Sequence, residues 1–281
     1  MVYFNGRLLT SGTDFLAESN RALKYGDAVF ETVRVVRKKI IFWEDHYLRL
    51  MASMRILRMD IPMNFTMEFL EEAILKTIDA NGYALQAVRI RLTVFRNEGG
   101  FYTPENQSVS YIIEASPIDN AIYTLSSEPY EVELFKDHWV NTGILSTIKS
   151  ANKIVNVLAG IYAKENGYNS CLLLNNDKKV VETISGNIFV VAGNTIKTPP
   201  LTDGCLNGIL RKQLIRIINK NPDFELEEAS VSPFELQKAD ELFTTNVISG
   251  IQPITKYRKK LYEKEVSKKL LNALNIDIRL S

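Results

Sequence analysis

The spacing of hydrophobic residues along the chain predicts a mixed α and β structure. Residues 30–36 are rich in β-branched and aromatic side chains, and residues 88–94 alternate apolar and polar positions; both patterns are typical of strands. Further strands are expected in segments 1–7, 40–43, 108–114, 171–196, 224–228 and 242–245. Apolar residues three and four positions apart predict helices over 44–57, 65–80, 151–165, 209–218 and 264–274.

A turn-forming segment divides this pattern into two parts. Ser116-Pro117-Ile118-Asp119-Asn120 combines residue types that favour turns and loops. A chain of 281 residues is long enough to form two domains, each with its own hydrophobic core. We therefore predict an N-terminal α/β domain over residues 1–117, a linker over 118–122 and a C-terminal domain over 123–281.

Charge and composition exclude several classes of partner. The sequence holds 34 Lys and Arg residues against 33 Asp and Glu residues, so its formal net charge of +1 offers no general attraction for nucleic acid or an anionic membrane. No apolar run is long enough to span a bilayer, and the amino terminus has the pattern of a strand and hairpin turn rather than a signal sequence. We therefore expect a cytoplasmic protein with neither a nucleic-acid nor a membrane partner.

The cysteines and histidines do not form a metal-binding pattern. Cys171 lies in an apolar run, which indicates a reduced thiol in the core rather than half of a disulfide. His46 and His138 each lack a neighbouring Cys or His at metal-ligand spacing. We therefore expect no metal and no catalytic thiol, and we assign structural roles to both histidines.

Three ionisable side chains indicate pyridoxal 5′-phosphate chemistry. This cofactor needs an amine for its aldehyde, an acid beside its pyridine nitrogen and donors for its phosphate. Lys149 can form the Schiff base, Glu182 can supply the acid, and Arg49 can supply a planar pair of donors. Considered singly, Lys149 is hardly distinguishable from the nearby Lys153, because most lysines are solvated surface residues.

Backbone amides are a second source of phosphate donors. The first N–H groups of a helix have no partner within the helix, and Asn207-Gly208-Ile209 begins the helix predicted over 209–218. A second backbone cradle is predicted in residues 246–250, directly after the strand predicted at 242–245.

With these residues in place, the chain resembles the fold-type IV pyridoxal-phosphate enzymes, also called the class IV aminotransferases. This family includes branched-chain and D-amino-acid aminotransferases and aminodeoxychorismate lyase. One matching segment would be weak support, but seven occur in the family's order and extend over nearly the whole chain: residues 25–31, 46–50, 148–149, 182–189, 207–211, 239–243 and 252–254.

The resemblance implies a two-domain α/β fold with the cofactor between the domains, and a homodimer whose partner chain helps to form each substrate pocket. It assigns Lys149 as the Schiff-base lysine and general acid/base, and Glu182 as the partner of the pyridine nitrogen, both within the C-terminal cofactor-binding domain. Residues expected to bind the cofactor are Arg49, Lys149, Glu182, Asn187, Ile209, Leu210, Val247 and Ile248, of which the last four act through backbone amides.

The substrate is expected to be a small molecule of the amino-acid type. Arg89 and Arg91 alternate on the strand predicted at 88–94, and either can anchor a carboxylate. Arg91 matches a substrate-pocket arginine of branched-chain aminotransferases, which favours amino transfer from a hydrophobic amino acid to a 2-oxo acid. The other expected substrate contacts are Phe30, Tyr102 and Asn246.

Two other activities stay open beside amino transfer. Residues 30–32, 207–211 and 245–246 are more similar to aminodeoxychorismate lyase, which releases pyruvate and 4-aminobenzoate. That lyase carries an arginine after a Gly-Gly pair, where this chain has Phe101-Tyr102. Ile154 replaces a tyrosine of the branched-chain enzymes, and Phe30 replaces a tyrosine of the D-amino-acid enzymes. The third alternative is a protein that binds pyridoxal phosphate without turning over a substrate.

Overall fold

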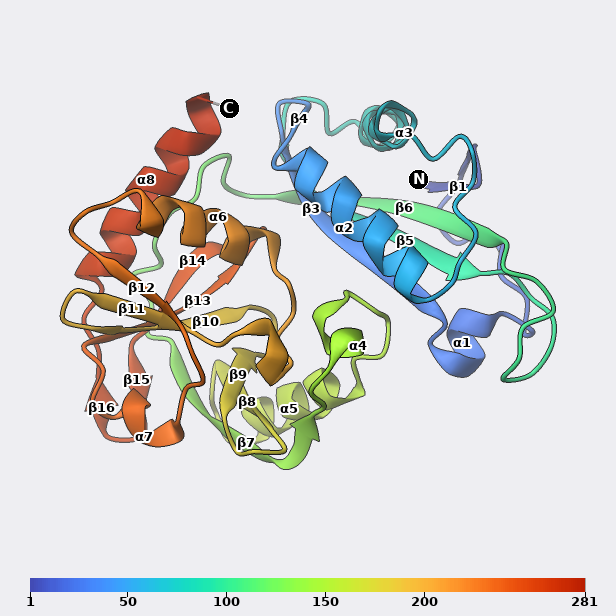
Figure 1. Ribbon diagram of the computed structural model, residues 1–281. Coiled ribbons are helices and arrows are strands. Elements are labelled where there is room, and N and C mark those ends of the chain that lie inside the picture. Colours follow the sequence, from blue (N-terminus) through green and yellow to red (C-terminus); the bar gives the residue numbers. More distant parts are fainter. Residues whose placement is uncertain (281) are drawn as a thin grey trace. The chain divides into compact units, whose positions relative to one another are not determined.

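The computed structural model describes residues 1–280, which form two compact units of mixed α and β structure (Figure 1). The first unit contains Met1–Ala121 and Ile148–Asn152, and the second contains Ile122–Thr147 and the chain from Lys153 onward. Two β-sheets with packed helices confirm the predicted α/β class. The division at residues 118–122 stays a prediction, and the return of 148–152 to the first unit is a feature that the sequence did not predict.

The first unit is built on an antiparallel six-stranded sheet in the order β2-β1-β6-β5-β3-β4. The hairpin predicted at the amino terminus is confirmed as its first two strands. The elements of this unit are β1 (Val2–Phe4), β2 (Arg7–Leu9), α1 (Arg21–Tyr25), β3 (Ala28–Val36), β4 (Lys39–Ile40), α2 (Trp43–Ile56), α3 (Met67–Ala80), β5 (Ala87–Arg96) and β6 (Val109–Ile118).

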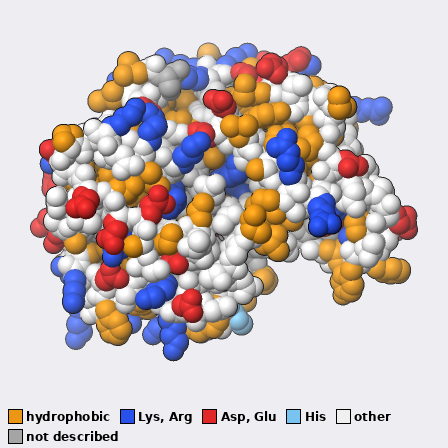
Figure 2. Space-filling view, viewed as in Figure 1, with side chains coloured by type: hydrophobic (Ala, Val, Ile, Leu, Met, Phe, Trp, Pro, Cys, Tyr) orange, Lys and Arg blue, Asp and Glu red, His pale blue; other side chains and the backbone are white. Residues whose placement is uncertain are grey.

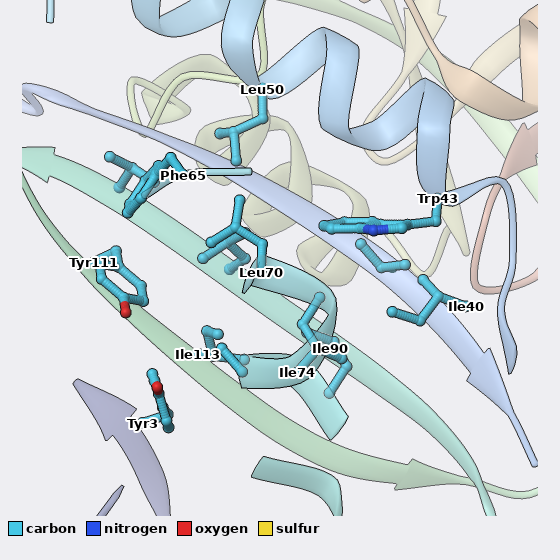
Figure 3. Close-up of a cluster of buried hydrophobic side chains, with 14 of the residues drawn as sticks. Tyr3, Ile40, Trp43, Leu50, Phe65, Leu70, Ile74, Ile90, Tyr111 and Ile113 are labelled. Atoms are coloured by element: carbon cyan, nitrogen blue, oxygen red, sulfur yellow. The ribbon is translucent and has the colours of Figure 1, made fainter. Parts of the chain in front are cut away.

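Alternation along the long strands gives this sheet one apolar face and one polar face. Val33, Ile90 and Ile113 on three neighbouring strands are fully buried in the core that the sheet forms with α2 and α3. Figure 3 shows this core, in which Leu70 and Ile74 of α3 approach the sheet. The alternate residues of β3 and β5 belong to the opposite face of the sheet; among them are Phe30, Thr32, Arg89, Arg91 and Thr93.

Two predicted boundaries in the first unit are wrong. Trp43 begins α2 instead of ending a strand, because its ring is buried in the core and its Nε1–H donates to the Met67 carbonyl at 3.2 Å. The expected turn at Ser116–Asn120 starts later, because β6 continues through Pro117 to Ile118. Proline is tolerated there because β1 pairs with β6 only farther back along the strand, which leaves that edge of Pro117 unpaired.

The second unit is built on a mixed sheet, which within residues 122–147 and 153–280 has the order β12-β11-β10-β9-β8-β7-β15-β16, with β13 pairing to β10 and β14. Its elements are β7 (Glu131–Val140), α4 (Ile144–Thr147), α5 (Ile154–Glu165), β8 (Ser170–Asn175), β9 (Val180–Thr183), β10 (Asn187–Ala192), β11 (Thr195–Thr198), the 3₁₀ helix η1 (Leu201–Asp203), α6 (Ile209–Asn219), β12 (Glu225–Glu228), α7 (Pro233–Leu236), β13 (Glu241–Asn246), β14 (Gly250–Ile254), β15 (Lys256–Tyr257), β16 (Lys260–Leu261) and α8 (Glu265–Leu280).

The surface in Figure 2 mixes acidic, basic and hydrophobic side chains on the visible face, as expected for a near-zero net charge. Among residues 1–280, every helix is too short or too polar to cross a membrane.

Glu241 fixes the start of α8 in the second unit. This carboxylate is 2% exposed and accepts hydrogen bonds from the N–H groups of Val266 and Ser267 at 2.6 and 2.9 Å. Because buried amides without acceptors are costly, we expect Glu241→Ala to lower the free energy of unfolding by about 2–3 kcal/mol. Denaturant titration measures the loss. The exposed Glu265 is the matched control, for which alanine should cost less than about 1 kcal/mol; equal losses would contradict the capping role.

Candidate active site

The backbone around Lys149 forms hydrogen bonds with the edge of β3 in the first unit. The Phe30 N–H donates to the Lys149 carbonyl at 2.8 Å, and the Ala151 N–H donates to the Ala28 carbonyl at 2.9 Å. Side chains alternate along extended backbone, and Ile148 enters the hydrophobic core at 4% exposure. Lys149 therefore points away from that core, toward the polar face of the sheet.

One aromatic ring lies beside two cationic groups on this face. The Nζ of Lys149 is 4.7 Å from the centroid of the Phe30 ring, and the Cζ of Arg91 is 3.8 Å from the same centroid. Aromatic faces attract cations at such distances. The Nε of Arg91 also donates to Thr93 Oγ1 at 3.2 Å, which limits the freedom of the guanidinium. Phe30 thus supports an amine and a guanidinium together.

Arg91 is better placed than Arg89 to bind a carboxylate away from water. Arg91 is half-buried, whereas Arg89 on the same face is exposed. Burial lowers the pKa of Arg91, the nearby Glu114 raises it, and Arg89 lowers it. An arginine stays protonated at neutral pH in spite of such effects, so Arg91 keeps its charge in a partly dehydrated position.

The apolar face of the same sheet holds a buried ionic cluster of Glu31, His46 and Arg49. Glu31 Oε1 accepts from Arg49 Nε at 2.8 Å, and Glu31 Oε2 accepts from Arg49 Nη2 at 2.5 Å. His46 Nδ1 lies 2.7 Å from Glu31 Oε2. Glu31 is 1% exposed and His46 is fully buried, so these hydrogen bonds replace water for all three groups.

Protonation in this cluster follows from burial and from the arginine. Burial by itself raises the pKa of Glu31, but the charge and hydrogen bonds of Arg49, followed by those of His46, outweigh it and lower that pKa to about 2. Burial also lowers the pKa of His46, against the opposing effect of Glu31. At neutral pH, Glu31 is therefore ionised and His46 is neutral, with Nδ1–H donating to Glu31. Among residues 1–280, His46 Nε2 has no hydrogen-bond partner.

In the second unit, Glu182 lies beside the loop that leads into α6. Glu182 is on β9, is 8% exposed, and accepts from the Leu206 N–H through Oε2 at 2.9 Å. Asn187, its partner in the β9–β10 register, donates from Nδ2 to the Leu206 carbonyl at 2.8 Å. Glu182 and Asn187 therefore both bind Leu206, and this contact places the Glu182 carboxylate near the start of α6.

The start of α6 has the features of an anion site. Gly208 precedes the first helical residue, Ile209, and no side chain caps the helix. A Cβ on Gly208 would overlap Asn187 Oδ1, so only glycine allows the loop to approach β10 this closely. The amides of Ile209 and Leu210 thus lie at the positive end of an 11-residue helix, where anions are stabilised.

A three-residue turn, Val247–Ser249, joins β13 to β14. Asn246 Oδ1 accepts from the N–H groups of Ile248 and Ser249 at 3.0 and 2.9 Å. Gly250 closes the turn with φ of +76°, a conformation that favours glycine. Asn246 therefore shapes the turn, while its expected contact with a substrate stays a prediction.

The expected site residues fall into groups that each unit brings together. In the first unit these are Phe30, Arg91 and Lys149 on the polar face and Arg49 on the apolar face. In the second unit they are Glu182, Asn187, Ile209 and Leu210 at the start of α6, and Asn246, Val247 and Ile248 in the turn. Tyr102 belongs to none of these groups, because it is 91% exposed and its ring packs against that of Tyr25, with 5.6 Å between the ring centroids.

The sequence from residue 28 to residue 257 matches the family described as "Amino-transferase class IV". This match includes Lys149, Glu182, Arg49 and the start of α6 and covers most of the chain. The chain belongs to the class IV aminotransferases. Enzymes of this family depend on pyridoxal 5′-phosphate, so the predictions of the family, of an enzyme and of the cofactor are confirmed.

Relatives within the class IV family include several activities. A provisionally assigned branched-chain-amino-acid aminotransferase of Methanocaldococcus jannaschii is 29% identical, with 90% of this chain and 86% of the relative aligned. The D-alanine aminotransferase of Bacillus licheniformis is 26% identical over 90% and 87% of the two chains. The branched-chain aminotransferase of Thermoproteus uzoniensis with norvaline has a TM-score of 0.87 at 26% identity, covering 99% and 94%. The 4-amino-4-deoxychorismate lyase of Pseudomonas aeruginosa has a TM-score of 0.82 at 25% identity, covering 99% of both chains.

The residues of this class IV chain fit the family cofactor. Lys149 supplies an amine beside an aromatic ring, and Glu182 supplies a buried carboxylate. The uncapped start of α6 lies beside that carboxylate in the second unit and suits a phosphate. The donor types that the cofactor needs are therefore all present.

Sequence reasoning missed the partners that position these groups. Glu31 was part of a matching segment without a role, yet it binds Arg49 and His46. Its signal was an acidic residue on the apolar side of β3, facing a helix that carries His46 and Arg49 three positions apart. Leu206 carries no such signal, because its contacts with Glu182 and Asn187 use only its backbone.

Proposed function

We propose that this enzyme transfers the amino group of a hydrophobic L-amino acid to a 2-oxo acid. One observation carries the proposal: Lys149 Nζ and the Arg91 guanidinium both lie near the ring of Phe30. A catalytic amine and a carboxylate anchor on one face are what an α-amino acid requires, since its reacting carbon carries the carboxylate. The names of the Methanocaldococcus and Thermoproteus relatives support a branched-chain substrate.

Lys149 acts in this proposal as the group that holds the cofactor and then moves the substrate proton. Its amine must be unprotonated to accept a proton from the α-carbon, and a lysine in water has a pKa near ~10.4. In this role the amine requires that burial and the adjacent cofactor lower that value. When bound, pyridoxal phosphate supplies an electron sink for the charge left on that carbon.

The other residues bind and orient. Glu182, oriented by the Leu206 N–H, provides the negative charge for the pyridine nitrogen, and Asn187 holds the same loop. By similarity to the family, the phosphate is bound by the amides of Ile209 and Leu210, by the turn Val247–Ser249 and by Arg49. The expected working form is a homodimer, by similarity to the family, and the expected location is the cytoplasm.

A lyase activity is the second candidate. The lyase of Pseudomonas aeruginosa covers 99% of this chain, and Phe30-Glu31-Thr32 is similar to the corresponding lyase segment. Against it, Phe101 and Tyr102 stand after Gly99-Gly100, where the lyase family carries an arginine. This difference removes a carboxylate contact, so amino transfer is the better supported reaction.

A substrate panel tests the proposal. We expect kcat/KM for 2-oxo-acid formation from L-leucine, L-isoleucine or L-valine, with several 2-oxo acids as acceptors, to exceed that from D-alanine by at least about tenfold. Pyruvate release from aminodeoxychorismate should stay at background. Faster release of pyruvate and 4-aminobenzoate would replace the proposal with the lyase, and preferred use of D-alanine would overturn the stereochemical assignment.

The carboxylate anchor is checked with the same assay. Arg91→Leu should raise KM for the amino acid by about 10²-fold, because removal of one partner of a partly buried charge pair costs 2–5 kcal/mol. The exposed Arg89 is the matched control, and Arg89→Leu should change KM less than about threefold. Equal effects of both substitutions would count against a specific contact with Arg91.

A further inference from the structure

Asn152 is the last residue of the segment 148–152, after which the chain returns to the second unit. Its side chain is exposed, and its Nδ2 donates to the Gly26 carbonyl at 3.2 Å. The hydrogen bonds of Lys149 and Ala151 with β3 use only backbone groups, so they do not depend on the residue types. Asn152 adds a contact between this segment and the first unit that does depend on its side chain.

The amide group of Asn152 packs against the backbone of Gly26. A Cβ added to Gly26 would overlap Asn152 Oδ1 and would lie 3.0 Å from Asn152 Cγ. Gly26 is also the C-cap of α1, with φ of +64°, a conformation that favours glycine. Glycine at this position therefore allows both the end of α1 and the close approach of the Asn152 side chain.

The backbone that receives Asn152 is held in place by buried ion pairs. Asp27 Oδ2, in the residue after Gly26, accepts from Arg21 Nε at 3.0 Å and from Arg96 Nε at 2.9 Å. Arg21 belongs to α1 and Arg96 is the last residue of β5, and they are 3% and 5% exposed. Buried pairs are screened by salt much less than exposed ones. Gly26 therefore gives Asn152 a fixed point of attachment.

Both ends of the segment that carries Lys149 are thus fixed to the first unit. Ile148 lies in the hydrophobic core at one end, and Asn152 binds Gly26 at the other. Side chains alternate along extended backbone, so a slip of one residue would turn Lys149 from the polar face to the apolar face of the sheet. A fixed end point resists such a slip and keeps the amine on the polar face.

We propose that Asn152 is a positioning residue for Lys149, whose amide fixes the end of the segment 148–152 on Gly26 and so holds the lysine amine where it reaches the cofactor aldehyde. This inference rests on the proposed function, in which Lys149 holds the cofactor. Asn152 itself need not contact the cofactor. Its effect is on the covalent part of the affinity, in which a C=N bond forms between amine and aldehyde and one water molecule is released.

The test compares pyridoxal phosphate with pyridoxamine phosphate, which has the same ring and phosphate but an amine in place of the aldehyde. Kd for each is measured by absorbance titration of the apoenzyme, and the preference for the aldehyde isolates the bond with Lys149. Asn152→Ala should lower this preference about fivefold, the effect of one hydrogen bond, and leave Kd for pyridoxamine phosphate within about twofold. Asn166→Ala is the matched control, because the exposed Asn166 also donates from Nδ2 to a carbonyl, that of Tyr162, at 2.8 Å.

Gly26→Ala tests the same contact from the other side. The added methyl group displaces the Asn152 amide, so the preference should fall at least as far as in Asn152→Ala. Gly82→Ala is the matched control, because Gly82 has a similar φ of +73° but a Cβ there would meet nothing within 4 Å. In an Asn152→Ala background, Gly26→Ala should lower the preference little further, because the two changes remove one contact.

The outcomes separate this inference from the function on which it rests. A wild-type preference for the aldehyde that persists in Lys149→Ala would overturn the assignment of Lys149 and the role of Asn152 together. A preference that depends on Lys149 but survives intact in Asn152→Ala would overturn the role of Asn152 alone. An equal loss of affinity for both vitamers in Asn152→Ala would also overturn it, because the effect would not be specific to the amine. Thermal unfolding of each apo variant checks that the protein is folded.

Discussion

Lys149→Ala lowers the turnover number for amino transfer by at least about 10³-fold, whereas Lys153→Ala leaves it within about threefold. The expected loss is large because, in the proposed function, one side chain holds the cofactor and moves the proton, and positioned acid–base catalysis alone contributes about 10²–10⁴-fold. Lys153 is a suitable control because it is close in sequence but precedes α5 in the second unit. Steady-state kinetics at saturating cofactor measure both values.

Chemical trapping gives an independent check of this expectation. Reduction of the wild-type holoenzyme with borohydride, followed by peptide mass spectrometry, should place the cofactor on the peptide that contains Lys149. Lys149→Arg should be inactive and unlabelled although it keeps the positive charge, because a guanidinium stays protonated. Label on another lysine, or activity in either Lys149 variant near that of the wild type, would remove the assignment.

Glu31→Ala lowers the free energy of unfolding of the first unit by about 3–5 kcal/mol. Removal of one partner of a buried ion pair leaves the other charge without compensation, and here the loss affects both Arg49 and His46. Trp43 lies in the core of this unit, so its fluorescence in a Trp139→Phe background reports on the unfolding of the first unit. Glu72→Ala, which breaks the exposed pair with Lys76, should cost under about 0.5 kcal/mol.

The pH dependence of the same transition has a definite sign. Glu31 and His46 both have a pKa that folding lowers, so the unfolded chain binds protons at a higher pH than the folded chain. The stabilisation that comes from these two lowered pKa values is therefore complete above about pH 6.5, the ordinary pKa of histidine, and declines as the pH falls. The part due to Glu31 is lost between its ordinary value of 4.5 and its folded value of about 2. Glu31→Ala should lack that part, and an unchanged acid transition would contradict the role of the cluster.

Local patterns in the sequence predicted most of the fold. The period of the apolar residues located β3, β5, α3, α6 and β13, because each buries one face against a sheet or helix. The boundaries that failed depend on distant partners. Trp43 joins a helix because its ring reaches the core and Met67, and Pro117 continues a strand because β5 pairs with it, and neither partner is visible in the local sequence.

The candidate site could be proposed from the sequence where chemistry requires particular residue types. Lys149, Glu182 and Arg49 are predicted because the cofactor needs an amine, an acid and a phosphate donor, and because their order matches the family. The residues that hold them were not recognisable in this way. Glu31 lies on the apolar side of β3, but its partners His46 and Arg49 are 15 and 18 positions away in the sequence. Leu206 contacts Glu182 and Asn187 through its backbone alone, so its residue type carries no signal.

The attachment of Lys149 to β3 has a consequence for any attempt to divide the protein. Residues 148–152 complete the first unit, but they are inserted between two segments of the second, so no single cleavage of the polypeptide isolates either unit intact. A fragment that stops at Ala121 would expose the Phe30 N–H and the Ala28 carbonyl at the edge of β3. Exposed strand edges favour non-native pairing with other chains. The pairing also closes a loop of about 120 residues, an entropic cost that delays it until late in folding. In a nascent chain, Lys149 therefore reaches its final position only after synthesis has passed well beyond the first sheet.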